Sequence, residues 1–283
     1  MKYSIIIPAH NEESFLGHTL TSVLNQSLLP VEVIVVNDGS TDRTAEIVEE
    51  FIHKHSIFRL VNIDTPSTHQ PGAKIINAFY KGFEALNHDW DLIAKLDADL
   101  ILPSDYFEKI IQSFKNNPNL GIAGGRIYIK SNNKWIYENV SKKDHVRGAI
   151  KTYSKACFEK TGGPRRSIGW DTADELLALY NGFEIKVLPE LKVKLLKPTG
   201  TVYKNIHGLK IGESFYKLDY GFLISLIAAL KASWNNKNLK LFTDITKGYW
   251  SSALKSENKI VTPKEGKFIR SYRMKGIIDR LKF

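Results

Sequence analysis

The sequence predicts an α/β fold: a mostly parallel central sheet flanked by helices, followed by a basic helical C-terminal extension. In the first hundred residues, apolar runs typical of strands alternate with helical patterns. Polar residues follow directly where several of these runs end, which is where open α/β sheets bind ligands. The charge then changes along the chain, because residues 184–283 hold 20 Lys+Arg and 8 Asp+Glu, against 20 and 22 in residues 1–183.

Four strands are expected in the first hundred residues, at Ser4–Ile7, Val31–Val36, Phe58–Ile63 and, as a buried strand, Asp91–Leu96. Helices with apolar residues three and four positions apart separate them. Strands that alternate with helices indicate βαβ units, whose strands pair in parallel. A further strand is expected at Phe183–Leu188.

Helix starts and irregularities are marked by polar residues and glycines. Asn11, Thr41 and Ser104 precede helical patterns and are expected to be N-caps, because their side-chain oxygens can accept hydrogen bonds from helix N–H groups. Gly72 is expected to open the third helix. The pair Gly124-Gly125 predicts a bulge in a strand or a close approach to a ligand.

The composition is that of an ordinary globular protein of 283 residues, 43% of them apolar. The single cysteine, Cys157, allows no internal disulfide and no zinc cluster, which is typical of a reducing compartment. A strand-like run follows Met1 directly, and we see no secretory signal. We therefore expect a cytoplasmic protein.

Two aspartates close the fourth predicted strand, in the sequence Asp97-Ala98-Asp99. Residues two apart along a strand point to one side, so both carboxylates can address one ligand. Mg²⁺ and Mn²⁺ prefer such oxygen ligands, often together with substrate phosphates. The spacing alone is equally consistent with two solvated loop acids, because Asp-x-Asp is common.

Other polar groups follow neighbouring strands and extend this pattern. Asp38 can accept hydrogen bonds from a nucleotide base or ribose, although an Asx turn would also explain it. Lys74 lies in the first turn of a helix, where backbone N–H groups favour a phosphate. Together with the segment Pro8–Glu13, these residues indicate a nucleotide site.

The chain resembles the family-two, A-type-fold glycosyltransferases, which transfer sugars from nucleotide diphosphates with inversion. The resemblance rests on Pro8–Glu12, on Val36–Asp42 (Val-Asn-Asp-Gly-Ser-Thr-Asp) and on Asp97-Ala98-Asp99. It covers about residues 1–200. It implies a nucleotide-sugar-binding half in residues 1–100 and an acceptor-binding half of the same domain in residues 101–200. The composition turns basic after Thr199-Gly200, so we place a subdomain boundary near there and assign residues 201–283 to the basic extension.

The resemblance also implies roles for individual residues. Asp38 contacts the base, which is uracil or another base, and Asp99 binds a Mg²⁺ or Mn²⁺ ion. The remaining residues expected to contact the donor are Pro8, Ala9, Glu12, Lys74, Asp97 and Ala98. Asp171 falls at the position of the family's catalytic base, eleven residues before Gly182.

Two departures from the family pattern bear on the site. Trp170 stands where the family has a glutamate, and Asp174 and Glu175 compete with Asp171 for the role of general base. Asp171 could instead serve only as the N-cap of the helix that follows. Leu195-Leu196-Lys197 stands where related chains carry histidines, and His207 is a poor substitute as a third metal ligand.

The chemistry implied by the resemblance needs this set of residues. A cation neutralises the leaving diphosphate, and one carboxylate deprotonates the acceptor hydroxyl as general base. A single displacement then inverts the anomeric centre. The alternatives are a nucleotide-sugar-binding module without activity and a sugar-phosphate nucleotidyltransferase, although the first strand lacks the glycine-rich basic loop of the latter.

The basic tail suggests the partners. A short apolar helix from about Tyr220 to Trp234, flanked by Lys217 and Lys231, could lie on an anionic membrane. It could equally pack beneath the catalytic sheet. No nucleic-acid-reading motif accompanies it. We expect a lipid-linked or glycan acceptor and peripheral contact with the inner face of the membrane.

Overall fold

The computed structural model describes residues 1–64, 72–139, 143–197 and 207–281. The chain folds into two compact units. The N-terminal unit comprises Met1–Gly163 and Asn181–Thr199, and the C-terminal unit comprises Pro164–Tyr180 and Gly200–Phe283. A segment from the middle of the sequence therefore belongs with the C-terminal helices. The subdomain boundary that we expected near residue 200 lies outside the described residues.

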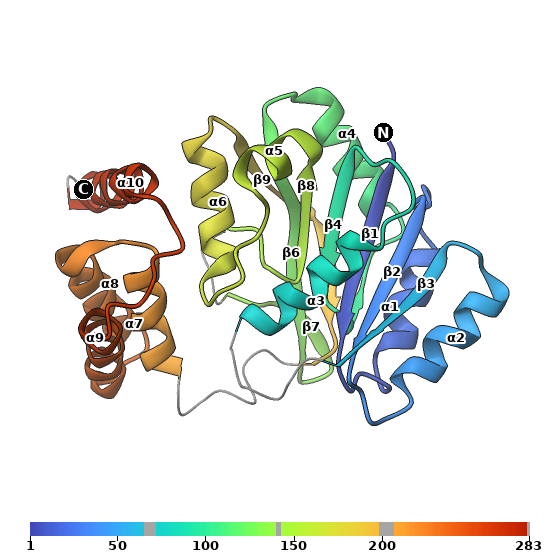
Figure 1. Ribbon diagram of the computed structural model, residues 1–283, viewed down its shortest axis with the longest axis horizontal. Coiled ribbons are helices and arrows are strands. Elements are labelled where there is room, and N and C mark those ends of the chain that lie inside the picture. The colour runs from blue at the N-terminus through green and yellow to red at the C-terminus, as the bar shows by residue number, and fades with distance from the viewer. Residues whose placement is uncertain (65–71, 140–142, 198–206, 282–283) are drawn as a thin grey trace. The chain divides into compact units, whose positions relative to one another are not determined.

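The described residues of the N-terminal unit form a nine-stranded mixed sheet (Figure 1). Its strands are β1 (Tyr3–Ala9), β2 (Glu32–Asp38), β3 (Phe58–Ile63), β4 (Leu92–Leu96), β5 (Leu100–Ile101), β6 (Leu120–Ser131), β7 (Lys134–Tyr137), β8 (Ile150–Ser154) and β9 (Glu184–Leu195). They lie in the order β3-β2-β1-β4-β8-β6-β9-β5, and β7 pairs with β6. The first four are parallel, as predicted, whereas β8 runs antiparallel to both of its neighbours.

Helices cover both faces of the parallel strands. They are α1 (Leu16–Leu24), α2 (Thr44–Lys54), α3 (Ala73–Glu84), α4 (Tyr106–Asn116) and α5 (Lys155–Thr161). Ile5 and Ile7 of β1 pack in one apolar cluster with α1, α2 and α4. Ile6 points the other way, toward α3, where a Cβ on Gly82 would lie 2.6 Å from its side chain. Burial on both faces explains why these strands are continuous apolar runs.

The three predicted helix caps are wrong. α1 begins only at Leu16, and Asn11 has a left-handed backbone (φ 54°) with its side-chain oxygen 2.8 Å from the backbone nitrogen of Thr41. α2 begins at Thr44, whose N–H donates to Asp42 rather than to Thr41 (3.0 Å). α4 begins after Asp105 with no side-chain cap. Asn11 and Thr41 instead connect two loops to each other.

The glycine pair in β6 lies at an irregularity of the strand pairing, as the predicted bulge requires. The pairing of β6 with β9 changes register between Gly124 and Arg126. A Cβ on Gly125 would overlap the carbonyl oxygen of Leu191 in β9. β9 extends beyond the predicted Phe183–Leu188, because its second half pairs with the residues of β6 that follow this irregularity.

The C-terminal unit is helical in its described residues. Its helices are α6 (Trp170–Tyr180), α7 (His207–Lys217), α8 (Gly221–Asn235), α9 (Leu239–Leu254) and α10 (Pro263–Leu281). Ala173 and Leu177 of α6 are buried in one cluster with Leu218, Ile224 and Ile269. α8 confirms the helix predicted from Tyr220 to Trp234. None of the helices in the described ranges is long and apolar enough to cross a membrane.

Helices α7 and α9 touch backbone to backbone at two glycines. A Cβ on Gly212 would overlap the carbonyl oxygen of Ile245, and a Cβ on Gly248 would overlap that of Leu209. Because the obstructing atoms belong to the backbone, neither position can gain a side chain unless the helices separate.

We expect Gly248→Ala to lower the free energy of unfolding of the C-terminal unit by about 1–3 kcal/mol, the usual cost of overpacking. Gly276→Ala in α10 is the matched control, because nothing lies within 4 Å of its Cβ position. That control should gain up to about 1 kcal/mol from helix propensity. Denaturant unfolding followed by circular dichroism measures both, and equal effects would contradict the close packing.

Candidate active site

The carboxyl ends of β1, β2 and β4 meet at one edge of the sheet. Ala9 lies opposite Asn37 in the parallel pairing of β1 with β2, and Ile6 lies opposite Lys95 in the pairing with β4. The loops that follow these strands therefore lie beside one another. The last residues of the strands and the loops after them carry the residues predicted to bind the donor in the N-terminal unit, apart from Lys74, which lies in the first turn of α3.

The loops after β1 and β2 are fastened to each other by hydrogen bonds. The Nδ1 atom of His10 lies 2.6 Å from the carbonyl oxygen of Asp38, and the N–H of Asn11 donates to the hydroxyl of Ser40 (3.0 Å). The N–H of Glu12 donates to the hydroxyl of Thr44 (2.8 Å). Sequence reasoning missed the part played by His10, because nothing in its local pattern distinguishes it from a surface histidine.

Asp38 is buried and has a basic partner. Its carboxylate lies 3.5 Å from the ammonium group of Lys74, in the first turn of α3. The side chain of Asp38 is 4% exposed and that of Lys74 is 39% exposed. The structure thus brings together the residue predicted to contact the base and the residue predicted to contact a phosphate, and it pairs their charges.

The Asp97-Ala98-Asp99 segment is held from below by Thr19 of α1. The Thr19 hydroxyl donates to the carbonyl oxygen of Ala98 (2.7 Å) and accepts from the N–H of Leu100 (2.9 Å). Thr19 is fully buried. Thr19 therefore positions the backbone at the Asp97-Ala98-Asp99 segment. The sequence of α1 did not suggest this role, because its pattern indicated only which apolar residues face the core.

A buried lysine lies two residues before the first aspartate. Lys95 is 1% exposed, forms an ion pair with Asp97, and donates to the carbonyl oxygen of Gly148 (3.0 Å). Its carboxylate partner Asp97 is 31% exposed. The pair offsets part of the negative charge at the end of β4 and fixes the position of Asp97.

Asp99 is the most perturbed carboxyl group of this edge. Burial, followed by the negative charges of Asp97 and Glu12, raises the pKa of Asp99 to about 7, although the Lys197 ammonium opposes the shift. The Oε1 atom of Glu12 lies 3.1 Å from the Lys197 ammonium. The Oε2 atom of Glu12 is buried and has no hydrogen-bond partner among the described residues.

The acidic cluster of Glu12, Asp97 and Asp99 fits a divalent cation bound partly by substrate. It offers carboxylate oxygens, which hard cations prefer, and one buried oxygen to which no described residue donates a hydrogen bond. Across the described residues, no three His, Cys, Asp or Glu side chains converge closely enough to hold a metal ion on their own. Any bound ion would therefore complete its coordination with donor phosphates and water.

The three candidate bases lie on α6, in the C-terminal unit. Asp171 is half-buried in the first turn of α6. Asp174 is 1% exposed, and its carboxylate accepts a hydrogen bond from the N–H of Glu175 (2.7 Å). Of Asp171 and Asp174, only Asp171 is open to solvent, and an acceptor hydroxyl needs such access.

The sequence profile described as glycosyl transferase family 2 matches residues 4–164. The chain belongs to this family. The match covers β1 to β8 and thus all the strand ends described above. Family membership confirms the resemblance that the motifs predicted.

Curated relatives of the chain match part of it. A poly-beta-1,6-N-acetyl-D-glucosamine synthase of Staphylococcus epidermidis is 29% identical over 183 residues, which are 60% of this chain and 42% of that protein. The probable glycosyltransferase YdaM of Bacillus subtilis is 38% identical over 130 residues, 45% of this chain and 30% of YdaM. The chain thus spans less than half the length of these relatives.

Solved structures share the A-type glycosyltransferase fold. Residues 1–349 of S. aureus TarS superpose with a TM-score of 0.57 at 17% identity, over 91% of this chain and 73% of that one. The mannosyltransferase PcManGT of Pyrobaculum calidifontis, in complex with GDP-Man and Mn²⁺, also gives 0.57, at 13% identity over 99% of this chain and 87% of that one. The fold predicted from the sequence is confirmed.

The position of the expected histidines is occupied differently here. Leu195 is buried and pairs with Leu100, and Lys197 directs its charge to Glu12. His207 begins α7, and its side chain lies outside the described residues. This chain therefore places the ammonium group of Lys197 beside the acidic cluster.

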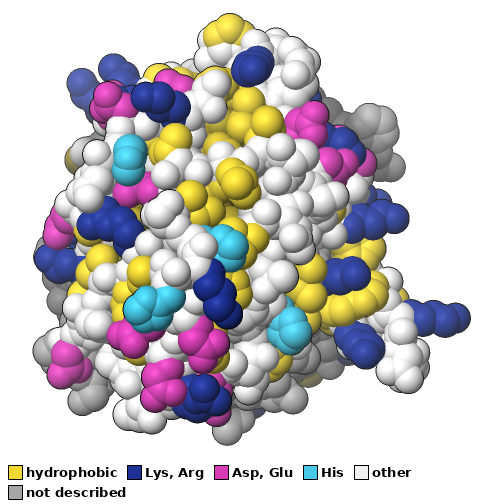
Figure 2. Space-filling model, turned by 90° about the vertical axis from the view of Figure 1, so that its right-hand side faces the viewer, with side chains coloured by type: hydrophobic (Ala, Val, Ile, Leu, Met, Phe, Trp, Pro, Cys, Tyr) yellow, Lys and Arg dark blue, Asp and Glu magenta, His cyan; other side chains and the backbone are white. Residues whose placement is uncertain are grey.

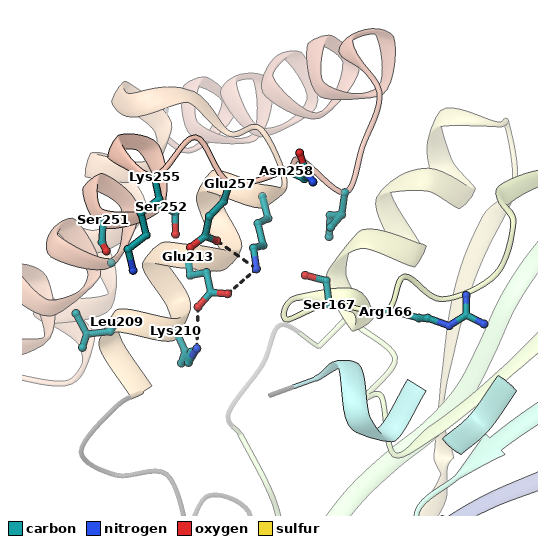
Figure 3. Close-up of a pocket in the computed structure, with 13 residues that line it drawn as sticks. Arg166, Ser167, Leu209, Lys210, Glu213, Ser251, Ser252, Lys255, Glu257 and Asn258 are labelled. Atoms are coloured by element: carbon teal, nitrogen blue, oxygen red, sulfur yellow. Dashed lines mark hydrogen bonds and ion pairs between the residues drawn. The ribbon is translucent and has the colours of Figure 1, made fainter. Parts of the chain in front are cut away.

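A cavity in the C-terminal unit contains none of these candidate residues (Figure 3). Within it, Glu213 accepts hydrogen bonds from Lys210 (2.9 Å) and Lys217 (2.6 Å), and Lys217 also lies 3.3 Å from Glu257. Although burial opposes it, these two lysines hold the pKa of Glu213 below its usual value. Lys210, Lys217, Glu213 and Glu257 are thus paired with one another, and the pair of Lys217 with Glu257 joins α7 to the segment after α9.

The raised pKa of Asp99 predicts a stability effect. In metal-free protein, the folded state keeps a proton on Asp99 up to about pH 7, whereas the unfolded state releases it near pH 4. The free energy of unfolding of the parent therefore falls as the pH rises from 4 to 7, because a buried carboxylate must then carry its charge. Asp99→Asn carries no such charge, so its free energy of unfolding should exceed that of the parent by up to about 4 kcal/mol at pH 8 and should approach the parental value near pH 4.

Urea unfolding in the presence of a chelator, repeated from pH 4 to pH 8, measures this difference. Asp89→Asn, a change of the same charge at an exposed carboxylate, controls for net charge. If the Asp99→Asn curve runs parallel to the parent curve over the whole range, the buried carboxyl group is not under electrostatic strain.

Proposed function

We propose that this chain is an inverting glycosyltransferase that moves a sugar from a nucleotide diphosphate, UDP in the first instance, to a hydroxyl acceptor. The observation that carries the proposal is the cluster of Glu12, Asp97 and Asp99 at the carboxyl ends of parallel strands, with Asp38 on the same edge. Similar structures of TarS are described in complex with UDP and with UDP-GlcNAc, which supports UDP.

In this proposal the loops at the sheet edge hold the donor. Asp38 accepts hydrogen bonds from the base, and Lys74, its ion-pair partner, contributes positive charge toward the diphosphate. The residues that line the rest of the donor site are Pro8, Ala9, Glu12, Asp97 and Ala98. Asp99 holds a Mg²⁺ or Mn²⁺ ion, which when bound neutralises charge on the leaving diphosphate.

Asp171 acts as the general base. Its carboxylate takes the proton of the acceptor hydroxyl while that oxygen forms a bond to the anomeric carbon of the donor sugar. The bond between the anomeric carbon and the diphosphate oxygen breaks, and the diphosphate keeps the electron pair. Because one displacement occurs, the configuration at the anomeric carbon is inverted.

The acceptor is proposed to be a glycan or a lipid-linked sugar in the synthesis of a surface polysaccharide or glycolipid. A curated relative is named as a polysaccharide synthase, which supports this class of acceptor. Lipid-linked acceptors require an enzyme that reaches the bilayer. We therefore include peripheral contact with the cytoplasmic face of the membrane in the proposal.

Asp171→Asn should lower the rate of sugar transfer by about 100-fold or more, because it removes the general base. The dissociation constant of UDP, measured by calorimetry, should change little. Single-turnover transfer from UDP-sugars with Mn²⁺ measures the chemical step. If Asp174→Asn or Glu175→Gln is the crippled variant instead, the base is assigned to the wrong residue of α6.

Asp99→Ala should abolish both sugar transfer and the Mn²⁺-dependent part of UDP binding while leaving the circular dichroism spectrum unchanged. Its carboxylate is proposed as the metal ligand, so the variant and the parent should bind UDP alike in a chelator. Transfer by this variant at the parental rate would refute the metal assignment. A parent chain that binds UDP but releases no sugar from any UDP-sugar would be a binding module.

A further inference from the structure

The turn between α8 and α9 forms a rigid tip on the C-terminal unit. The N–H of Lys237 donates to the carbonyl oxygen of Trp234 (3.1 Å), and the N–H of Asn238 donates to that of Ser233 (3.0 Å). The Ser233 hydroxyl also donates to the carbonyl oxygen of Asn238 (2.8 Å), whose side chain caps α9. The backbone of this turn is thus fully determined by hydrogen bonds.

This rigid tip exposes large apolar side chains. Trp234 and Leu239 are each 85% exposed, and Leu230 is 53% exposed. Leu230 and Trp234 are four residues apart on α8 and therefore share one face of the helix. Single exposed leucines are ordinary, but an apolar group of this kind marks an interaction site.

The charged residues in the sequence of the tip are all lysines. Between Asp219 and Asp244 the sequence contains no acidic residue and three lysines, at 231, 237 and 240. All three lysines are exposed, and none forms an ion pair with a described residue. Lys210 and Lys217 of the same unit, by contrast, are paired with Glu213. Mixed charges are also found elsewhere on the molecule: Figure 2 draws the side that lies on the right in Figure 1, and acidic and basic side chains lie side by side there.

We infer that this hairpin tip, made of Leu230, Lys231, Trp234, Lys237, Leu239 and Lys240, docks on the anionic headgroup layer of a membrane. Tryptophan prefers the boundary between headgroups and acyl chains. Leucines bury a short distance below it, while lysines contact lipid phosphates. The combination of apolar side chains and unpaired lysines on one turn matches this boundary.

The geometry favours a lipid surface over a protein partner. The exposed charged groups of the tip are all lysines, so an anionic surface complements it. Two copies joined tip to tip would bring six lysines together without a carboxylate, which repels. The arrangement also revises the expectation of a helix lying flat, because Lys217 is paired with Glu213 and Glu257, and Ile224 is buried.

The inference rests on the proposed function only for its purpose, since docking would bring the enzyme to a lipid-linked acceptor. Binding itself is measured without turnover. The full chain is sedimented with vesicles of phosphatidylcholine containing 30% phosphatidylglycerol, and with phosphatidylcholine alone, at low and high salt. We expect binding to the anionic vesicles only, weakened by salt.

Two sets of variants separate the apolar and the charged contributions. Trp234→Ser with Leu239→Ser, and Lys231→Gln with Lys237→Gln and Lys240→Gln, should each weaken vesicle binding by at least about tenfold. Leu254→Ser is the matched control, because Leu254 is 83% exposed at the other end of α9. It should bind like the parent.

Several outcomes would overturn docking: a parent that stays unbound, equal losses in the Leu254→Ser control, or a parent dimer that the Trp234→Ser, Leu239→Ser variant dissociates. Transfer to a water-soluble acceptor should be the same in the tip variants and the parent. If the parent binds vesicles but transfers no sugar, docking stands and the proposed function fails. If the parent transfers sugar without binding vesicles, the proposed function stands and docking fails.

Discussion

The parallel pairing of β1 with β2 on one side and β4 on the other is the constraint on which the site depends. Its register places Ala9 opposite Asn37 and Ile6 opposite Lys95, so three chain segments leave the sheet at the same edge. The cost of gathering Glu12, Asp97 and Asp99 there is electrostatic and is visible in the raised pKa of Asp99. The apolar core on both faces of the sheet offsets that cost, and two cations, on Lys95 and Lys197, reduce it.

The strands, their parallel order and the main motifs could be predicted because each depends on a short stretch of sequence. An apolar run such as Val33–Val36 predicts a buried strand whatever surrounds it. The two-residue spacing of Asp97 and Asp99 likewise predicts that both carboxylates point to one side. The helix caps failed for the opposite reason. Asn11 looks like a cap locally, but its partner is Thr41, thirty residues away, and the contact of Glu12 with Lys197 spans 185 residues. No local pattern contains such pairs.

The association of α6 with the C-terminal helices could not be predicted from the sequence either. Ala173, Leu176 and Leu177 form an apolar stripe that predicts burial, yet the stripe does not say which surface covers it. In the structure that surface comes from Leu218, Ile269 and their neighbours, nearly a hundred residues later for the latter. The helix that carries Asp171 thus owes its packing to a part of the chain that lies beyond the family match at residue 164.

The route of the chain through its two units has a consequence for synthesis. The segment Pro164–Tyr180 belongs to the C-terminal unit but is translated before Asn181–Thr199, which completes the N-terminal one. During synthesis, the apolar face of α6 therefore stays partly exposed until α10 has been translated. Domains normally fold as they appear, N-terminal first. Here α10 completes a core that α6 began, so a chain truncated before α10 would leave that apolar face exposed.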